Sequence, residues 1–439
     1  MQTVFRRVSM ANLLIAIVVS VLFEAALQAD DWTQWRGPNR DGVWHETGVL
    51  QSFPADGPQV RWRVPVGWGY SSPVIANGRV YVTDCQAMLP KAKERVLCFE
   101  EATGKPIWDY STDVTYAKDT YMTDKNGHPT TPGQLPTPTP IVNAGKIYAL
   151  GMPGNVVCLD ARRGGLLWKK DLAREYHMGD FPCPKASPLI ENHLLIIAIG
   201  GKPRACVIAL DKDSGKEAWR ALDDSVTHSS PIAITTGGKR QLILWTNEAI
   251  TSLDPATGKI HWRERLLTTS DYVVSTPVLH DNLLLIGGLM LKLDPEKPAA
   301  AVLWPNTRVV SRRILSNTST ALVQDGCVFS AKSNGQFVCL DAKTGKQLWE
   351  TDKVTDLKGG ASIHPTRNGR SVFLYTERGE LILANLSAQG YKEISRTRLL
   401  DPTYPFGGRN VAWSPPAYAN RCVFARSDKE LICVGLAAK

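Results

Sequence analysis

Short hydrophobic segments alternate with turn sequences along most of this chain of 439 residues. In the stretch 319–352, the hydrophobic positions fall into four segments, 320–323, 327–330, 336–340 and 346–350. Asp-Gly, Asn-Gly and Thr-Gly sequences separate them, and such pairs favour tight turns. Val-, Leu- and Phe-rich segments with turns between them are typical of an antiparallel meander. The pattern therefore predicts four consecutive strands.

The same unit recurs along the chain, and its most regular feature is a Trp eight residues after an acidic residue. Asp341-Ala-Lys-Thr-Gly345 followed by Trp349 is the clearest copy. In a looser copy Trp304 follows Asp294 by ten residues, and a seventh unit ends at Ile394 without a Trp. The outer-strand Trp residues of the units are Trp62, Trp108, Trp168, Trp219, Trp262, Trp304 and Trp349. A fixed period of this length predicts stacked copies of one unit.

The residues of the repeat suit structural roles. The Asp side chain can accept hydrogen bonds from the backbone amides that follow it, and the Gly can adopt positive φ without steric cost. A Trp on the outer strand is large enough to fill the wedge between neighbouring sheets. The repeat therefore predicts a scaffold and assigns no chemistry.

The count of units predicts a closed ring. An eighth unit begins at Ser414-Pro415, but no outer strand follows its third strand, 431–435. The segment 60–66 is a strand with its own Trp62 and no preceding partner. Inserting this strand into the last unit gives an all-β fold, an eight-bladed β-propeller of four-stranded antiparallel blades.

The repeat Leu-Asp-x-x-Thr-Gly-x-x-x-Trp is similar to that of the quinoprotein-type, pyrroloquinoline quinone (PQQ)-like propeller family. This family includes BamB and the propellers of PQQ-dependent alcohol dehydrogenases. The resemblance covers residues 60–439. The segment 32–42, Trp-Thr-Gln-Trp-Arg-Gly-Pro-Asn-Arg-Asp-Gly, resembles the lead-in of many exported members. We expect residues 30–59 to pack as a strap on the ring.

Residues 1–29 differ from the rest of the chain. Arg6 and Arg7 precede an apolar run from Ala11 to Phe23, and small residues follow it up to Ala29. A charged start, a short apolar run and a small-residue exit predict a cleaved secretory signal peptide. The mature protein is then periplasmic or secreted and has no transmembrane span, although an uncleaved anchor remains an alternative.

Charge and cysteine content narrow the possible partners. The formal net charge is +9, but the sequence has no Lys/Arg block with interleaved aromatic residues of the kind that favours nucleic acid. An acidic glycan or an envelope protein remains possible. Nine cysteines leave at least one unpaired within the chain. The repeat position shared by Cys98, Cys158, Cys339 and Cys433 predicts buried strand residues that act as small hydrophobes.

Candidate binding residues lie in the connections between units, which converge at one mouth of the central channel of a propeller. Several of these connections are long: 111–136, 171–186, 306–317 and 400–413. They and shorter connections carry Trp68, Tyr70, His177, His228, Tyr272, Arg313, Arg409, Asn410 and Trp413. An aromatic, basic mouth suits an anionic or extended ligand, because loops on a rigid scaffold often carry function. The alternative is that these aromatic residues cover the ring.

The resemblance to dehydrogenases implies PQQ bound over a Trp floor, Ca²⁺ held by Glu, Asn and Asp, and an Asp base. Many such enzymes also carry a disulfide between adjacent cysteines, which this sequence lacks. Asp180, Glu248, Asp271 and Asn410 supply suitable oxygen atoms, but Trp245 lies in a hydrophobic segment that favours the core. We therefore expect no catalytic residue, metal ligand or bound cofactor, with PQQ and calcium reserved for the dehydrogenase alternative.

Together these patterns predict a monomeric, exported, non-catalytic propeller that acts as a binding or scaffold module in the periplasm or cell envelope, as the resemblance to BamB implies. A PQQ-dependent alcohol or sugar dehydrogenase is the first alternative. A polysaccharide-binding propeller is the second, because the predicted mouth is basic and aromatic.

Overall fold

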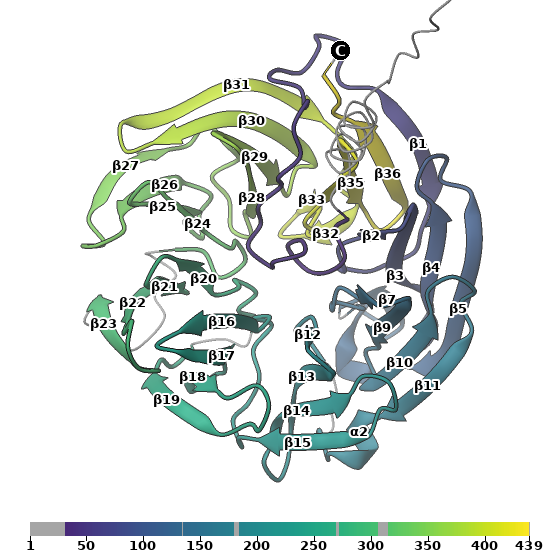
Figure 1. The fold of residues 1–439 in the computed structure, drawn as a ribbon. Helices are drawn as coiled ribbons and strands as arrows, with labels where there is room; N and C mark the ends of the chain where they lie inside the picture. The colour runs from purple at the N-terminus through teal and green to yellow at the C-terminus, as the bar shows by residue number, and fades with distance from the viewer. Residues whose placement is uncertain (1–30, 134, 180–183, 269–271, 306–314, 439) are drawn as a thin grey trace, which may run out of the picture.

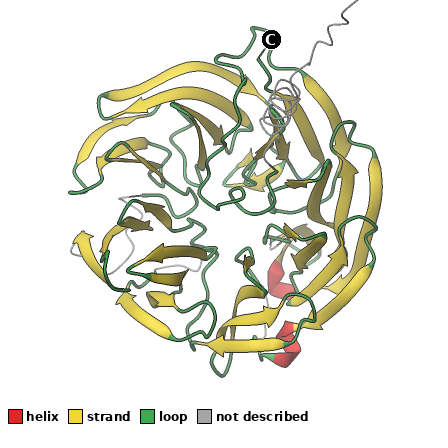
Figure 2. Ribbon diagram, in the orientation of Figure 1, coloured by secondary structure: helices red, strands yellow, loops and turns green. Residues whose placement is uncertain are grey.

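The computed structural model describes residues 31–438, apart from 134, 180–183, 269–271 and 306–314. Eight four-stranded antiparallel sheets surround a central axis as blades (Figure 1), and strands dominate the described chain (Figure 2). The predicted eight-bladed propeller is confirmed. The described helices are a 3₁₀ turn, η1 (Lys118–Thr120), and α2 (Leu172–Glu175). Neither is long or apolar enough to cross a membrane, and the predicted signal peptide lies outside the described residues.

The blades follow one another in sequence order around the ring. Blade 1 contains β2 (Val74–Ala76), β3 (Arg79–Met88), β4 (Lys91–Glu100) and β5 (Pro106–Thr115). Blade 2 contains β8 (Ile141–Asn143), β9 (Lys146–Leu150), β10 (Asn155–Asp160) and β11 (Leu166–Asp171). Blade 3 contains β12 (Leu189–Glu191), β13 (Leu194–Gly201), β14 (Ala205–Asp211) and β15 (Glu217–Ala221). Blade 4 contains β16 (Ile232–Thr236), β17 (Lys239–Trp245), β18 (Ala249–Leu253) and β19 (Ile260–Arg265).

The second half of the ring repeats this order. Blade 5 contains β20 (Val278–His280), β21 (Leu283–Ile286), β22 (Leu289–Leu293) and β23 (Ala300–Trp304). Blade 6 contains β24 (Leu322–Gln324), β25 (Cys327–Ala331), β26 (Phe337–Asp341) and β27 (Gln347–Thr351). Blade 7 contains β28 (Ile363–Asn368), β29 (Ser371–Thr376), β30 (Glu380–Ser387) and β31 (Gly390–Arg398). Blade 8 contains β34 (Ala417–Ala419), β35 (Cys422–Arg426), β36 (Glu430–Gly435) and β1 (Val60–Pro65).

The ring closes through β1, as the repeat count predicts. β1 pairs antiparallel with β36, and Val64 lies opposite Leu431. Trp62 is 7% exposed and belongs to the largest hydrophobic cluster of the molecule. The first strand of the propeller therefore completes its last blade and covers the edge of β36.

Most outer-strand Trp side chains reach forward to the turn of the next blade. The Trp304 indole N–H donates to the carbonyl of Ala342 at 3.0 Å, in the turn that Asp341 begins. Gly345 of that turn has φ +71°, and an added Cβ would lie 2.6 Å from the Trp304 ring. The corresponding Trp–Gly pairs are Trp62–Gly104, Trp108–Gly164, Trp168–Gly215 and Trp219–Gly258. The glycine therefore provides space for the Trp of the preceding blade as well as positive φ.

Blade 5 departs from this arrangement. Its turn begins at Asp294 and continues Pro-Glu-Lys-Pro, without the glycine that would admit a ring. Trp262 of blade 4 instead donates its indole N–H to the Gln241 side chain in its own blade, at 2.9 Å. The unit whose repeat is least regular in sequence, blade 5, is therefore also the one that does not accept the Trp of the preceding blade.

The Ser-Pro and Thr-Pro residues that open the units link the blades around the axis. The backbone N–H of Ser72 donates to Thr139 Oγ1 at 3.0 Å. Thr139 N–H donates to Ser187 Oγ at 2.9 Å, and Ser187 N–H to Ser230 Oγ at 3.0 Å. These bonds satisfy polar groups beside the channel and fix neighbouring inner strands relative to each other.

The segment 31–53 crosses the middle of the ring, as the purple trace in Figure 1 shows. Trp32 forms an antiparallel bridge with Ile75 on β2, and Val43 forms a parallel bridge with Arg367 on β28. Between them, Arg40 is 4% exposed and donates to the carbonyl of Pro188 at 2.7 Å. This strap thus contacts blades 1, 3 and 7 from inside the ring.

The eight described cysteines are all buried and free, and Cys183 lies outside the described residues. Cys98, Cys158, Cys339 and Cys433 are each at most 1% exposed, as their shared repeat position predicts. Burial raises the pKa of Cys98 and Cys158 to about 11. These thiols are therefore unreactive core residues at neutral pH.

Candidate functional site

Two hairpins cover the mouth at which the connections between blades converge. They are β6–β7 (Tyr121–Thr123 and Pro129–Pro132) and β32–β33 (Tyr404–Phe406 and Arg409–Val411). The Tyr404 hydroxyl donates to the carbonyl of Pro132 at 3.4 Å and so joins the two hairpins. Two of the long connections predicted from the sequence, 111–136 and 400–413, therefore contribute hairpins to a cover at this end of the ring.

Three of the predicted mouth residues pack into this cover. Tyr70 lies edge-on to Tyr404 with ring centroids 5.3 Å apart, and Trp68 does so at 6.3 Å. Trp413 is half-buried beneath Phe406, at 5.1 Å. Burial raises the pKa of Tyr70 well above its usual range, and the neighbouring Tyr404 adds to this. The sequence leaves open whether these aromatic residues bind a ligand or cover the ring. Their packing supports the second role.

A second aromatic group remains accessible beside the cover. The rings of His228 and Tyr272 are stacked 5.4 Å apart at 18°, and the Lys185 amine lies 6.0 Å from the centre of the Tyr272 ring. Tyr272 is 57% exposed. A flat aromatic face with a nearby cation can contact a partner side chain or a sugar ring.

Arg409 has a structural partner. Its guanidinium lies 3.0 Å from the carboxylate of Glu377, whose side chain is fully buried. Glu377 also accepts hydrogen bonds from the Thr355 hydroxyl at 2.9 Å and from the backbone N–H of Ser362 at 3.0 Å. Arg409 therefore holds the β32–β33 hairpin against blade 7, while its neighbour Asn410 is exposed.

The remaining predicted residues lie apart from the aromatic groups. His177 is exposed and follows α2 with φ 47°. Leu172 and Tyr176, at the two ends of α2, pack in the core shared by blades 2 and 3. Arg313 lies outside the described residues.

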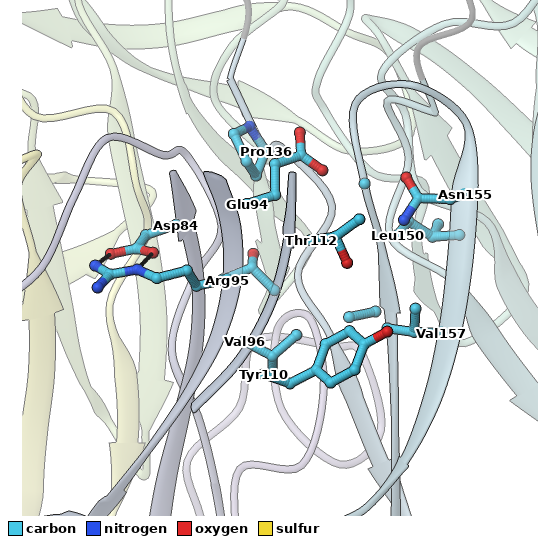
Figure 3. Close-up of a pocket in the computed structure, with 13 residues that line it drawn as sticks. Asp84, Glu94, Arg95, Val96, Tyr110, Thr112, Pro136, Leu150, Asn155 and Val157 are labelled. Carbon is cyan, nitrogen blue, oxygen red and sulfur yellow. Dashed lines mark hydrogen bonds and ion pairs between the residues drawn. The ribbon is translucent and has the colours of Figure 1, made fainter. Parts of the chain in front are cut away.

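A buried ionic network, which the sequence analysis missed, lies where blade 8 meets blade 1. Arg426 is fully buried and donates to the carbonyls of Thr83 and Gly67 at 2.7 and 2.6 Å. Asp84 is also buried and accepts hydrogen bonds from the Arg95 guanidinium at 2.8 and 2.5 Å (Figure 3). Burial lowers the pKa of Arg426, whereas the nearby Asp428 raises it. The sequence signal that could have identified this network is Arg426 itself, a charged residue at the end of the hydrophobic segment 422–426.

Trp245 and Glu248, two of the residues considered for PQQ and calcium, have structural surroundings in the described part of the chain. Trp245 is 1% exposed and lies in the core between blades 4 and 5, as expected. Glu248 accepts hydrogen bonds from the backbone N–H of Ser225, at 3.3 and 3.2 Å. Asp180 and Asp271 lie outside the described residues. Across the described part of the chain, no three His, Cys, Asp or Glu side chains gather closely enough to hold a metal ion. The described residues therefore do not fit the cofactor set that the resemblance implies.

A family model described as the outer membrane protein assembly factor BamB matches residues 92–293 and 291–390. These matches span well over half of the chain. The chain belongs to this family. The matched residues include the outer-strand Trp residues from Trp108 to Trp349 and extend from β4 of blade 1 to β30 of blade 7.

Individual relatives agree with this membership. The outer membrane protein assembly factor BamB of Yersinia pestis is 24% identical over 277 residues, which cover 55% of this chain and 66% of that protein. The chain therefore spans just under two thirds of that relative. The crystal structure of BamB from Moraxella catarrhalis has a TM-score of 0.58 at 17% identity, covering 86% of this chain and 99% of that one.

Dehydrogenases share the architecture of this BamB-family chain. The quinohemoprotein alcohol dehydrogenase from Comamonas testosteroni has a TM-score of 0.64 at 13% identity, covering 95% of this chain and 82% of that one. At this identity the likeness concerns the fold, which many unrelated functions share.

Proposed function

We propose that this protein is an exported, non-catalytic propeller of the periplasm or cell envelope that binds a protein partner in outer-membrane assembly. Membership of the BamB family supports this proposal, as does the name of the Yersinia pestis relative. The packing of Trp68, Tyr70 and Trp413 into a cover supports binding at the outer surface of the mouth.

The observation that carries the proposal is the distribution of exposed apolar side chains. In the described chain, the large hydrophobic residues that are exposed lie either on outer strands or at the mouth end. Those at the mouth end are Met88 (73% exposed), Tyr272 (57%), Leu357 (51%), Met122 (45%) and Phe406 (41%). Apolar groups gathered at one end of a soluble protein are typical of a docking surface. We therefore place partner binding on this apolar mouth face.

Site-specific photocrosslinking tests this placement. A benzophenone side chain at Met88, Met122 or Phe406 is expected to capture a component of the outer-membrane β-barrel assembly apparatus in intact cells. The matched controls are Lys105 and Lys343, which are exposed on turns at the opposite end of the ring. Equal capture from both ends, or capture from neither, would contradict the proposal.

The two alternative functions are tested directly on the purified mature protein. Dye-linked oxidation of an alcohol or sugar after addition of PQQ and Ca²⁺ would overturn the non-catalytic assignment. Salt-sensitive retention on an acidic polysaccharide, without any captured envelope protein, would instead favour a glycan-binding propeller.

A further inference from the structure

A small pocket lies at the seam between blades 1 and 2 and contains an unusual pair of polar side chains. Figure 3 shows Glu94, which extends from β4 toward the strand β10 that begins with Asn155. Glu94 is 7% exposed. The rest of the pocket lining is mixed, because Val157 and Leu150 of blade 2 are apolar whereas Thr112 and Tyr110 of blade 1 are polar.

The two oxygens of the Glu94 carboxyl group differ. Oε1 accepts a hydrogen bond from the Tyr116 hydroxyl at 2.9 Å and another from the backbone N–H of Met152 at 3.1 Å. Oε2 is buried and receives no hydrogen bond from the described residues, and the same is true of Asn155 Oδ1. A methyl group placed on Gly151 would collide with both of these oxygens at once, so they lie close together.

Two buried acceptors at such close range are unfavourable unless a hydrogen lies between them. A buried acceptor without a donor loses the hydrogen bonds that water would give it, and a carboxylate without full compensation is more costly still. A protonated carboxyl group removes both penalties, because its O–H is a donor. We propose that Glu94 is a proton-binding site whose neutral form donates from Oε2 to Asn155 Oδ1 and thereby links blade 1 to blade 2.

The charged groups around the site favour the neutral form. Asp84, on β3, pairs with Arg95 on β4, and this pair offers Glu94 no free cation. Cys85 on β3, Tyr110 on β5 and Tyr116 after β5 are the other titratable neighbours, and Glu94 adds to the raised pKa of Cys85 and Tyr116. On the blade 2 side, the lining residues Ala149, Leu150, Gly151, Asn155 and Val157 do not titrate.

The expected pH dependence follows from these surroundings. Burial raises the pKa of Glu94 from 4.5 to about 7, against the smaller opposite effects of the bonds from Tyr116 and Met152. Between pH 4.5 and about pH 7, the Glu94 carboxyl group holds a proton in the folded protein that it releases in the unfolded chain. The free energy of unfolding therefore falls as pH rises through this window and reaches its lower level above the folded pKa. Loss of the proton removes the proposed bond from Oε2 to Asn155, while the bond from Met152 to Oε1 remains.

The decisive measurement is the pKa of Glu94 in the full mature protein, followed by the carboxyl ¹³C chemical shift of labelled glutamate. Asn155→Ala removes the acceptor of the neutral form, so we expect the pKa of Glu94 to fall by about one unit, about tenfold in proton affinity. If the amide instead presents Nδ2 to an ionised carboxylate, the same substitution raises the pKa. A rise or no change would overturn the proposal. Asn385→Ala, which removes an exposed amide, should leave the pKa unchanged.

A second variant keeps the proposal testable if Asn155→Ala does not fold. Glu94→Gln carries an amide N–H that can donate to Asn155 Oδ1 at every pH. We expect its thermal stability to lose the decline that the wild-type protein shows between about pH 4.5 and 7. A curve parallel to that of the wild type would contradict the assignment, and a decline that appears only after a chelator is added would show that a cation holds the carboxylate. Neither readout depends on the proposed partner.

Discussion

At the scale of single residues, the glycine of the repeat shows which part of a structural role can be predicted from sequence. The turn chemistry of Asp341 and Gly345 is local, so it could be derived from the spacing alone: Asp341 accepts hydrogen bonds from the backbone N–H groups of Lys343 and Thr344. The contact between Gly345 and Trp304 joins residues from neighbouring blades. No local pattern reports such a contact.

This contact predicts unequal costs for two similar substitutions. Gly345→Ala introduces a Cβ at φ +71° that would lie 2.6 Å from the Trp304 ring, so strain and overpacking together should cost about 2–4 kcal/mol. Gly326→Ala is the matched control, because Gly326 has φ +73° with nothing within 4 Å of the added methyl. It should cost about 1 kcal/mol. Urea unfolding measures both, and equal losses would show that the Trp contact contributes nothing.

Glu94 shows the opposite case, in which a residue with no distinctive sequence context has an unusual environment. Its neighbours in β4 include Lys93 and Arg95, which suggest an ordinary exposed edge. The packing of blade 2 and of Tyr116 around this strand buries it. A rise of its pKa from 4.5 to about 7 corresponds to about 3 kcal/mol of free energy of unfolding, lost as pH rises through that window.

At the scale of elements, the strands follow from the hydrophobic pattern and the mouth hairpins do not. The segment 327–330 predicted from sequence is β25 (Cys327–Ala331), and 346–350 is β27 (Gln347–Thr351). In the connection 400–413, the sequence predicts candidate ligand-binding residues and no paired hairpin. The ion pair of Arg409 with Glu377 joins that hairpin to a different blade. The reach of a side chain across blades cannot be derived from spacing.

The ion pair between Arg409 of this hairpin and Glu377 of blade 7 leads to a prediction. Arg409→Ala leaves the fully buried Glu377 carboxylate without its cation, which should cost about 3 kcal/mol and expose the β32–β33 hairpin to proteolysis. Arg398→Ala is the control, because the ion pair of Arg398 with Asp401 is exposed and should contribute less than about 1 kcal/mol. Chemical denaturation and limited proteolysis measure the two effects. A loss for Arg409→Ala no larger than that of the control would show that the pair is dispensable.

At the scale of the whole molecule, the period of the repeat was sufficient to predict the ring and its closure. The path of the strap was not predictable, because residues 31–53 share no repeat with the blades that they contact. Trp32 and Trp44 both pack against Tyr418, with ring centroids 5.7 and 5.3 Å apart. Both Trp side chains are at most 2% exposed, so these two residues of the strap form part of the hydrophobic core.

The buried strap should therefore stay bound without a covalent link. A protease site inserted between Ala55 and Asp56, which are exposed, would separate it from β1. After cleavage of the native protein, we expect the strap to co-elute with the propeller in size-exclusion chromatography, since burying two Trp side chains stabilises the contact by several kcal/mol. Trp44→Ala should weaken this retention. Release of the cleaved strap from the propeller, without any substitution, would refute this prediction.

The pairing of β1 with β36 has a consequence for how the protein is made. Val60 lies opposite Val434, so the first strand of the ring cannot find its partner until the chain has been synthesised as far as β36. Contacts between such distant parts of a chain form slowly, because closing the intervening loop is entropically costly. Until then β1 and the unpaired edge of β36 each present open backbone hydrogen-bonding groups, which can pair wrongly with other chains. Biogenesis is thus most vulnerable at its final step, when the two ends of the propeller meet.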